Sequence, residues 1–534
     1  MINDSQFDWT IEPNLRTLLE KAVSRYRDKT FLIIEDGETV TYGVFKKEVD
    51  RIADVLKNQG VSKGTLVGVM LPNILLFPVT LCACYTLGAV MIPMNVSYRS
   101  EDARYVLNFS ELPIMITTAQ IYSDTISGIR ESCPHLQTVI VDGALETSDP
   151  SVKALADLKK TDPPEPEPLN IEPTDLATIL FTSGTTGYPK GCMHDQTYWL
   201  YLARKVVNYA GLTENDCLLT AQPFYYMDPQ WNLVAVLMSG SKMVLMKRFS
   251  PTRFWENAIR HKATFCNAIL PNLLYQAMPP DLKNKHSFRI IACTILPASL
   301  QRELEERTGV PWRPNFGMTE TGADLMVPVE AEHLVGSGCI GRAVWGREVR
   351  VVDENDNDVP PGEVGEMILR GKGIMQGYYK NPEATAEAFR GGWFHTGDLV
   401  RMDAEGWVYF VGRKKDMVRR SDENISAVEV ENVLVSHPKI EEAAMLPVPD
   451  DIRGEEIKVY IQLVEGETSE TVPPQEIAEY CASRLAPYKV PRYYEYVDSL
   501  PRTPASGKVE KYKLKEAKQD LRQGSYDRID DVWR

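Results

Sequence analysis

Short apolar runs alternate with helical stretches along the N-terminal half of the chain. Apolar runs that lack a polar alternation are typical of parallel strands buried on both faces of a sheet. The runs predicted as such strands are Leu66–Met70, Val90–Ile92, Ile114–Thr117, Thr138–Val141, Ala177–Phe181, Lys242–Met246 and Ile290–Ile295. Because helical stretches lie between them, the pattern predicts an α/β fold with wound sheets.

The most apolar segment, Leu71–Met94, has a composition that would suit a membrane span. It contains Pro72, Pro78, Gly88 and Pro93, which interrupt a continuous helix. The pattern favours a buried helix followed by a short strand, as in the core of an α/β protein.

The pattern changes after about residue 340, where short strands separated by turn residues indicate a β-rich subdomain. From Gly412 onward it returns to mixed α/β, with a strand predicted at Lys458–Leu463 and helices at Val428–Leu434 and Gln475–Leu485. This stretch is long enough for a small separate domain. The Pro-rich, acidic segment Lys160–Pro173 is expected to be an exposed connector.

The composition is that of an ordinary globular protein, with 43% hydrophobic and 25% charged residues. A chain of 534 residues is expected to form at least two domains. The net charge of −15 makes nucleic acid and a membrane surface poor partners, because both are anionic. The nine cysteines form no CxxC pair and are expected to be core residues in a reducing compartment. The first residues show no secretion signal, so a cytoplasmic location is expected.

A loop rich in hydroxyls and glycines, TSGTTGYPKG at residues 182–191, directly follows the predicted strand Ala177–Phe181. Backbone N–H groups, hydroxyls and a lysine ammonium at such a place can bind phosphate oxygens. The loop is not a Walker loop, because the GxxxxGK[ST] spacing is not met. By composition alone, a flexible surface loop is the favoured interpretation.

The same loop closely resembles the nucleotide-binding signature of the adenylate-forming superfamily, which includes acyl-CoA synthetases, peptide-synthetase adenylation domains and luciferases. The further signatures of that superfamily follow in its order: NFGMTET at 315–321, WFHTGD at 393–398, GRKKD at 412–416 and PRTPASGK at 501–508. The resemblance spans nearly the whole chain. It implies a large N-terminal domain of wound α/β sheets with a β-rich subdomain, residues 1–414, and a small mobile α+β C-terminal domain, residues 415–534.

The resemblance implies an enzyme in which a carboxylate attacks the α-phosphate of ATP and pyrophosphate leaves, with Mg²⁺ as a further cofactor. The implied ATP-binding residues are Thr182, Ser183, Gly184, Thr185, Thr186, Gly187, Lys190, Asn315, Gly317, Met318, Asp398 and Arg413. Among them, Asp398 and Arg413 resemble ribose contacts. Taken singly, each charged group would be interpreted as solvated or ion-paired.

Four further residues are implied to act in catalysis and domain movement. Thr319 resembles the phosphate-contacting threonine of the superfamily, and Glu320 resembles its magnesium ligand. Lys508 matches the lysine that moves into the site and stabilises the adenylation transition state. Lys415 falls at the hinge about which the small domain rotates for thioester formation.

The substrate pocket of the superfamily lies beside FYYMDPQWN at residues 224–232, where Tyr226 replaces a histidine and Asp228 adds a carboxylate. A carboxylate facing an apolar pocket is costly without a cationic partner. The alternative is that Asp228 caps a helix or pairs with a base of the protein. The expected substrate contacts are Asp228, Phe224, Ser299 and Gly317, with a strand at Cys293–Pro297 in another wall.

An Asp228 that faces the substrate implies an acid with an ammonium group. This resembles the stand-alone enzymes that load β-amino acids onto acyl carrier proteins in macrolactam biosynthesis, where an aspartate of this region binds the β-amino group. Crotonobetaine/carnitine–CoA ligases, which use free CoA, are also similar along much of the chain and are the alternative. No Arg or Lys lies between Asn315 and Gly341, so an apolar substrate side chain is expected.

Two features concern the thiol acceptor. Asp422 stands where relatives carry a glycine in the pantetheine tunnel, which would affect thioester formation more than adenylation. The basic residues Arg413, Lys414, Lys415, Arg419 and Arg420 would suit the acidic helix of a carrier protein, or would form a solvated basic face.

A nucleotide-binding relative without catalytic activity is the alternative class of protein. The complete set of Thr319, Glu320, Asp398 and Lys508 favours the enzyme. The sequence contains no GxSxG elbow, no HExxH motif and no metal-ligand pattern among its seven histidines.

Overall fold

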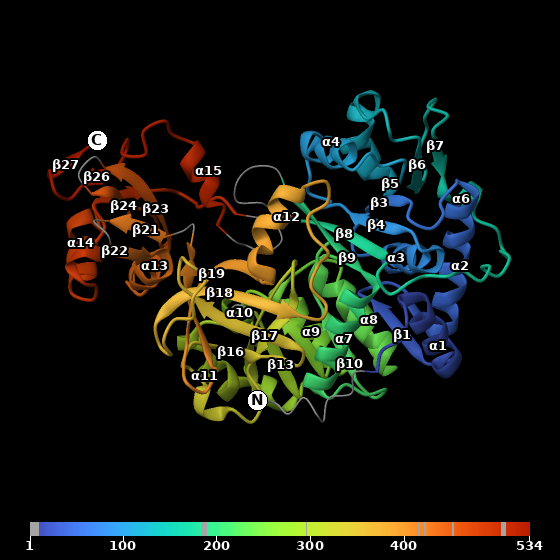
Figure 1. Cartoon of the computed structure of the whole chain (residues 1–534), viewed down its shortest axis with the longest axis horizontal. Helices are drawn as coiled ribbons and strands as arrows, with labels where there is room; N and C mark the ends of the chain where they lie inside the picture. Colours follow the sequence, from blue (N-terminus) through green and yellow to red (C-terminus); the bar gives the residue numbers. More distant parts are fainter. Residues whose placement is uncertain are drawn as a thin grey trace. The chain divides into compact units, whose positions relative to one another are not determined.

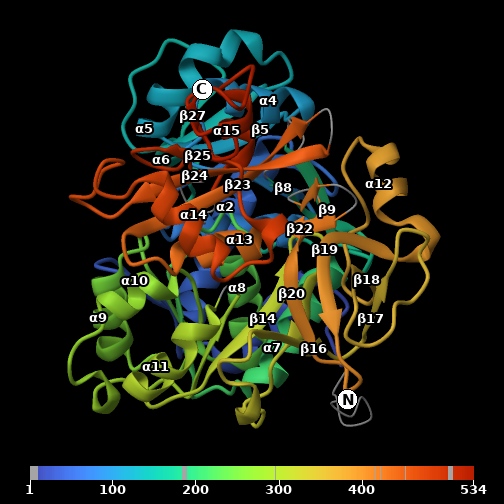
Figure 2. The same ribbon diagram turned by 90° about the vertical axis from the view of Figure 1, so that its left-hand side faces the viewer.

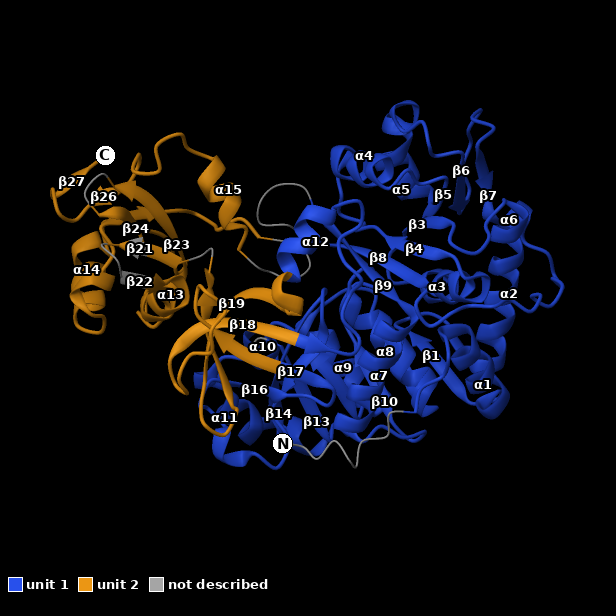
Figure 3. Ribbon diagram, viewed as in Figure 1, with its two compact units in different colours: residues 1–348, 370–389 blue, residues 349–369, 390–534 orange. Residues whose placement is uncertain are grey.

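The structure, a computed structural model, describes residues 10–182, 189–294, 296–414, 417–420, 423–450, 453–502 and 509–534. The chain divides into two compact units (Figure 3). Unit 1 comprises residues 1–348 and 370–389, and unit 2 comprises residues 349–369 and 390–534. The functional division expected at residue 414 stays a prediction.

One sheet of unit 1 has the strand order β7-β6-β5-β3-β4-β8-β9 (Figure 1). Its strands are β3 (Leu66–Met70), β4 (Val90–Pro93), β5 (Ile114–Thr118), β6 (Thr138–Asp142), β7 (Val152–Ala154), β8 (Leu176–Thr182) and β9 (Lys190–Asp195). All neighbours are parallel except β8 and β9, which form an antiparallel hairpin with Thr182 opposite Lys190. The hairpin therefore places Thr182 beside Lys190.

Within unit 1, the strands of a second sheet follow the order β16-β15-β14-β13-β12-β10-β11-β1-β2. Its strands are β1 (Thr30–Ile34), β2 (Thr39–Thr41), β10 (Cys217–Thr220), β11 (Lys242–Leu245), β12 (Phe265–Ala268), β13 (Ile290–Cys293), β14 (Trp312–Met318), β15 (Gly322–Met326) and β16 (Cys339–Ala343). The central strands are parallel, whereas β14, β15 and β16 are antiparallel to their neighbours in that group. The tight turn between β14 and β15 follows from this change of direction.

Helices cover these sheets, and α7 packs against α8 beside the second sheet (Figures 1 and 2). The main helices of unit 1 are α1 (Leu15–Tyr26), α2 (Tyr42–Asn58), α3 (Leu76–Leu87), α4 (Ser100–Phe109), α7 (Gln196–Ala210), α8 (Met227–Ser239), α9 (Pro251–His261), α10 (Pro271–Gln276), α11 (Ala298–Thr308) and α12 (Pro382–Ala388). Helix α7 begins where the Asp195 carboxylate accepts a hydrogen bond from the backbone N–H of Tyr198 and ends at Gly211, which has a positive φ.

Unit 2 contains the antiparallel strands β18 (Val364–Gly371), β19 (Phe394–Met402) and β20 (Val408–Arg413). Its other sheet has the order β22-β21-β24-β25-β26-β27, with β23 paired to β24. The strands are β21 (Met417–Arg420), β22 (Glu423–Ser426), β23 (Ile440–Asp450), β24 (Gly454–Leu463), β25 (Tyr493–Tyr496), β26 (Tyr526–Asp527) and β27 (Val532–Trp533). Helices α13 (Ala427–Val435), α14 (Pro474–Ala482) and α15 (Lys511–Glu516) complete it.

The predicted α/β class is confirmed, and the predicted strands correspond to observed ones, except for the strand expected over Cys293–Pro297. The strand expected over Ile290–Ile295 is shorter and ends at Cys293, while Leu71–Met94 forms the buried helix α3 and the strand β4. No helix in the described part of the chain is long and apolar enough to cross a membrane. The nine cysteines are all buried and are free thiols.

Gly211 ends α7 and Gly240 ends α8. Substituting each by alanine separates the cost of an unfavourable backbone conformation from the cost of a steric contact. Gly240 has φ +74°, and an added Cβ would lie 2.2 Å from the ring carbon Cζ of Tyr26. Gly211 has φ +57° with no atom within 4 Å of an added Cβ. Gly211→Ala is expected to cost about 1 kcal/mol of stability through its backbone conformation alone.

Gly240→Ala is expected to cost a further ~1–3 kcal/mol, because the new methyl group must displace the Tyr26 ring. Differential scanning calorimetry of the two variants should therefore show a larger fall in Tm for Gly240→Ala. Equal shifts would mean that the contact with Tyr26 relaxes without cost.

Candidate active site

The ends of the hydroxyl-rich loop lie on the β8–β9 hairpin. Thr182 ends β8 and donates its hydroxyl to the carbonyl oxygen of Lys190 at 3.4 Å. Lys190 begins β9, and its ammonium lies 4.9 Å from the centre of the Tyr378 ring, at cation–π distance. Ser183, Gly184, Thr185, Thr186 and Gly187 lie outside the described residues.

The NFGMTE motif forms the end of β14 and the turn into β15. Asn315, Gly317 and Met318 belong to β14, and Thr319 and Glu320 form the turn. A Cβ on Gly317 would lie 2.0 Å from the carbonyl oxygen of Gly322. Only glycine allows this close approach of the two strands, so the motif requires Gly317 for backbone reasons as well.

The Glu320 side chain is oriented by a residue that the sequence motifs do not include. The Tyr378 hydroxyl lies 3.1 Å from Oε1 of Glu320, and the Glu320 carbonyl accepts the backbone N–H of Met375 at 2.8 Å. Burial and the nearby Glu320 carboxylate raise the pKa of Tyr378, so its hydroxyl stays protonated and donates. Tyr378 thus contacts the Glu320 carboxylate through its hydroxyl and the Lys190 ammonium through its ring.

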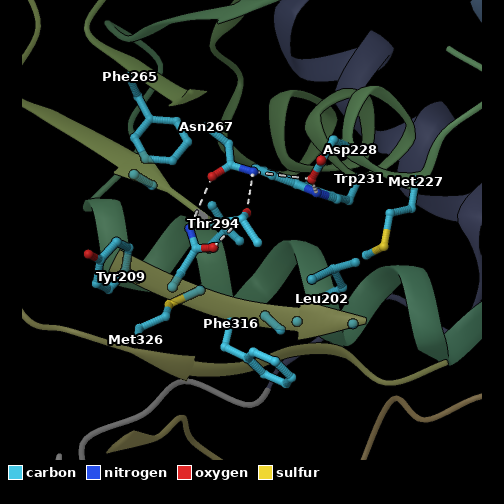
Figure 4. Close-up of a pocket in the computed structure, with 16 residues that line it drawn as sticks. Leu202, Tyr209, Met227, Asp228, Trp231, Phe265, Asn267, Thr294, Phe316 and Met326 are labelled. Carbon is cyan, nitrogen blue, oxygen red and sulfur yellow. Dashed lines mark hydrogen bonds between the residues drawn. The ribbon is translucent and has the colours of Figure 1, made fainter. Parts of the chain in front are cut away.

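A cavity of about 100 Å³ lies between α7, α8 and the ends of β12 to β15 (Figure 4). Its lining residues are Leu202, Val206, Tyr209, Met227, Asp228, Trp231, Phe265, Asn267, Ala292, Thr294, Asn315, Phe316, Gly317, Gly322, Ala323 and Met326. Most of this lining is apolar. Asp228 is the one charged residue among the described residues that line it.

Neutral donors surround the Asp228 carboxylate. The indole N–H of Trp231 donates to Oδ1 at 2.7 Å, and the Asn267 amide donates to the same oxygen at 3.3 Å. The Gln222 amide donates to Oδ2 at 2.6 Å. Burial raises the pKa of Asp228, and these three hydrogen bonds oppose that shift. No described Lys, Arg or His forms an ion pair with Asp228, although the sequence led us to expect a cationic partner.

The fold fixes Asp228 through the start of α8. Helix α8 is capped at Tyr226, and Asp228 lies in its first turn, where the partial positive charge of the helix end stabilises a carboxylate. The loop before the helix is held by Asn73, which accepts the backbone N–H of Phe224 at 2.8 Å and donates to the carbonyls of Gln222 and Met246. Asp228 is therefore neither the helix cap nor paired with a described base.

A chain of amides joins Asp228 to the NFGMTE motif. Asn315 donates to Asn267 at 3.0 Å, and Asn267 donates to Asp228 and, at 3.4 Å, to the Thr294 hydroxyl. Thr294 in turn donates to the side-chain oxygen of Asn315 at 2.9 Å. Figure 4 shows dashed lines from Asn267 to Asp228 and to Thr294. These polar groups satisfy one another.

Asp398 and Arg413 occupy facing positions on β19 and β20 in unit 2. The Arg413 Nε lies 3.0 Å from Oδ1 of Asp398, whose carboxylate is buried. Two implied ribose contacts are thus brought together by strand pairing. In the same unit, Nζ of Lys414 lies 3.1 Å from Oε2 of Glu366.

Several expected site residues lie elsewhere. Lys508, Lys415 and Asp422 lie outside the described residues. Phe224 is fully buried, packs on Phe77 with ring centres 5.2 Å apart, and does not line the cavity. Ser299 is exposed on α11 and does not line the cavity either, and the expected wall strand over Cys293–Pro297 is replaced by β13, which ends at Cys293.

The sequence reasoning missed Tyr378, Asn267 and Trp231. Trp231 follows Asp228 by three residues on α8, so helical spacing alone would have brought the two together. Tyr378 and Asn267 come from distant segments, and no local pattern marks them.

Comparison with known proteins identifies the family. Residues 19–379 match the family model of the AMP-binding enzyme, and residues 429–508 match that of the AMP-binding enzyme C-terminal domain. The chain belongs to the AMP-binding enzyme family. It is 31% identical over 518 residues to the crotonobetaine/carnitine–CoA ligase of Salmonella typhi, a match that covers 94% of this chain and 99% of that relative.

Solved structures agree with this assignment. The anthranilate CoA ligase AuaEII in complex with anthranoyl-AMP superposes with a TM-score of 0.84 and 27% identity, covering 97% of this chain and 99% of that one. The o-succinylbenzoate CoA synthetase MenE from Bacillus subtilis, with its acyl-adenylate OSB-AMP, gives 0.82 and 27%, covering 96% and 99%. ATP-bound MatB from Rhodopseudomonas palustris gives 0.82 and 25%, covering 95% and 99%.

The enzyme is thus an ATP-dependent, AMP-forming acid–thiol ligase that uses ATP with Mg²⁺. The described residues fit these groups. Glu320 offers an oriented carboxylate, a hard oxygen ligand of the kind Mg²⁺ prefers. The described residues contain no group of three or more His, Cys, Asp or Glu that could hold a metal. Mg²⁺ usually keeps several waters and binds substrate phosphates through one or two carboxylates, so phosphate and water oxygens would complete the ligand set beside Glu320.

Tyr378→Phe tests the orientation of Glu320. Loss of the hydroxyl removes a hydrogen bond that orients the carboxylate, so the Mg²⁺ concentration for half-maximal pyrophosphate exchange should rise about tenfold or more, because a hydrogen bond to a charged group contributes ~1.5–3 kcal/mol. Titration of Mg²⁺ at saturating ATP measures this. An unchanged Mg²⁺ requirement would mean that Tyr378 does not affect Mg²⁺ binding.

Proposed function

We propose that the enzyme adenylates a β-amino acid (3-amino carboxylic acid) and transfers the aminoacyl group to the phosphopantetheine thiol of an acyl carrier protein. The first part of this proposal, adenylation of a β-amino acid, rests on the environment of the Asp228 carboxylate. This carboxylate faces the cavity, and among the residues that the structure describes it has only neutral hydrogen-bond donors. A substrate ammonium would supply the compensating charge that a buried carboxylate needs.

The hydrogen bonds of Asp228 favour an ammonium that carries protons. Oδ1 accepts from Trp231 and Asn267, whereas Oδ2 accepts only from Gln222 among the described residues. Each carboxylate oxygen can accept about two hydrogen bonds. Oδ2 therefore has capacity for one N–H donor, which a primary ammonium possesses and a trimethylammonium lacks.

The remainder of the cavity favours an apolar substrate side chain. Leu202, Val206, Met227, Phe316 and Met326 supply apolar walls, and the described lining contains no cation for a second substrate carboxylate. The Tyr209 hydroxyl is already donated to the carbonyl of Val327 at 2.8 Å. A short hydrophobic chain suits the small volume.

The anthranilate ligase supports this substrate class. Anthranilate carries its amino group on the carbon next to the one that bears the carboxylate, which is the relative position found in a β-amino acid. That ligase superposes on this chain with 27% identity.

The adenylation machinery follows from the resemblance and from the site. ATP supplies the electrophilic α-phosphorus, and Mg²⁺ balances the phosphate charge. Lys190, the Thr319 hydroxyl and the Glu320 carboxylate would act on the phosphates and the metal, Asp398 and Arg413 on the ribose, and Lys508 on the transition-state charge. Lys415 would serve as the hinge between the two half-reactions.

Free CoA as acceptor is the second candidate, as in the crotonobetaine/carnitine–CoA ligases. The basic cluster that would suit a carrier protein is partly engaged: Arg413 pairs with Asp398, Lys414 with Glu366, and the buried Arg420 with Glu456 at 2.8 Å. Incubation of the preformed adenylate with holo carrier protein and, separately, with CoA decides between them. Efficient transfer to CoA alone would replace the carrier protein in the proposal.

Asp228→Asn tests the substrate class. Pyrophosphate exchange with 3-aminobutanoate should lose about two orders of magnitude in kcat/KM, since removing one partner of a buried charge pair costs ~3–5 kcal/mol and the asparagine recovers part of this. Exchange with butanoate should be unchanged or improved. An equal loss with both acids would assign Asp228 a structural role.

The pH dependence provides an independent test. Because the pKa of Asp228 is raised above its ordinary value of 3.8, the carboxylate takes up a proton at a higher pH than an ordinary aspartate as the solution is acidified. The kcat/KM for 3-aminobutanoate should therefore fall on the acid side, and the Asp228→Asn variant should lack that fall. Identical profiles for both proteins would contradict an ionised Asp228.

A further inference from the structure

The backbone carbonyl of Thr319 accepts two hydrogen bonds from buried side chains. The His194 Nε2 lies 2.7 Å from this oxygen, and the Tyr198 hydroxyl lies 2.8 Å from it. Both side chains are fully buried, and their rings stack with centres 4.0 Å apart. We call His194 and Tyr198 the carbonyl clamp.

The direction of each hydrogen bond in the clamp is fixed. A carbonyl oxygen only accepts, so the proton of His194 must be on Nε2. Burial lowers the pKa of His194 to about 3, so the ring is neutral and Nδ1 is an acceptor. The Thr178 hydroxyl lies 3.3 Å from Nδ1, and the Trp199 indole donates to that hydroxyl at 3.1 Å. The chain of donors therefore runs from Trp199 to the Thr319 carbonyl.

The clamp joins two parts of the site that are far apart in the sequence. Thr178 lies on β8 and His194 on β9, in facing positions of the hairpin that flanks segment 183–188. Tyr198 lies in the first turn of α7. His194 and Thr319 are 125 residues apart in the chain. The clamp thus ties the phosphate-loop hairpin directly to the Thr319–Glu320 turn.

We propose that His194 and Tyr198 are positioning residues for adenylation, which hold the Thr319–Glu320 turn at a fixed place relative to the β8–β9 hairpin. This rests on the proposed roles of Thr319 at phosphate and Glu320 at Mg²⁺. One donor would satisfy the carbonyl, whereas two donors from separate elements also restrict its lateral movement. Displacement of reacting groups by about 1 Å can cost 10²-fold in rate.

Three substitutions separate positioning from bulk stability. His194→Leu removes the donor, His194→Gln keeps an N–H near the position of Nε2, and Tyr198→Phe removes one hydroxyl. The matched control is Tyr42→Phe, since the fully buried Tyr42 hydroxyl also contacts backbone carbonyls, those of Val236 at 3.0 Å and Ser241 at 2.7 Å, outside the site. Pyrophosphate exchange is measured with the best acid of the wild-type enzyme, together with Tm and the Mg²⁺ requirement.

Tyr198→Phe is expected to lower kcat about tenfold and His194→Leu about 30-fold, with a raised Mg²⁺ requirement and KM for the acid within twofold. His194→Gln should recover most of the rate. Tyr42→Phe should lower Tm similarly to Tyr198→Phe and leave kcat unchanged. The proposal is overturned if the clamp variants change only Tm, or if His194→Gln is as impaired as His194→Leu.

The two proposals fail separately. A wild-type enzyme that accepts plain acids and rejects amino acids refutes the proposed substrate, while the effect of the clamp is still measured with the acid that is accepted. Clamp variants that match Tyr42→Phe in every kinetic constant refute the clamp and do not affect the assignment of the substrate.

Discussion

The close contact between Gly317 and the carbonyl of Gly322 governs both halves of the site in unit 1. A side chain at residue 317 would place Cβ 2.0 Å from that oxygen, so any other residue would separate β14 from β15. The same hairpin forms a wall of the cavity with Gly317, Gly322 and Ala323 and ends in the turn that carries Thr319 and Glu320. One β-hairpin therefore supplies both a wall of the cavity and the Thr319–Glu320 turn.

Buried charges around this hairpin differ in how they are compensated, and the difference indicates their roles. Asp324 pairs with Arg347 at 2.7 Å, and neither side chain is exposed. The buried Lys205 donates to the carbonyl of Ala323 at 3.1 Å, and burial lowers its pKa. These three side chains hold β15 in place, and none of them lines the cavity. Asp228, in contrast, meets only neutral donors among the described residues, which is the arrangement expected where a ligand brings the opposite charge.

Strand pairing in unit 2 shows how ion pairs alter a prediction based on charge alone. Arg413, Lys414 and Arg420 lie close together in the sequence and suggest a basic surface. In the structure each has a carboxylate partner on another strand: Asp398, Glu366 and Glu456. A run of basic residues in the sequence therefore does not establish a positively charged surface. The folded chain places acidic residues from other strands beside them, and these neutralise the charge.

The sequence by itself determined the α/β class, the strands β3, β4, β5, β6 and β8 of the first sheet, the order of the family motifs and the presence of a carboxylate at residue 228. These follow from local properties: apolar runs must be buried, and glycines and hydroxyls in a short loop have a characteristic chemistry. Only the tertiary structure decided that Tyr378 orients Glu320, that Asn267 and Trp231 hold Asp228, and that His194 and Tyr198 contact Thr319. The physical reason is that a hydrogen bond depends on the distance between two atoms in space, and the packing of the folded chain brings together His194 and Thr319, which are 125 positions apart in the sequence.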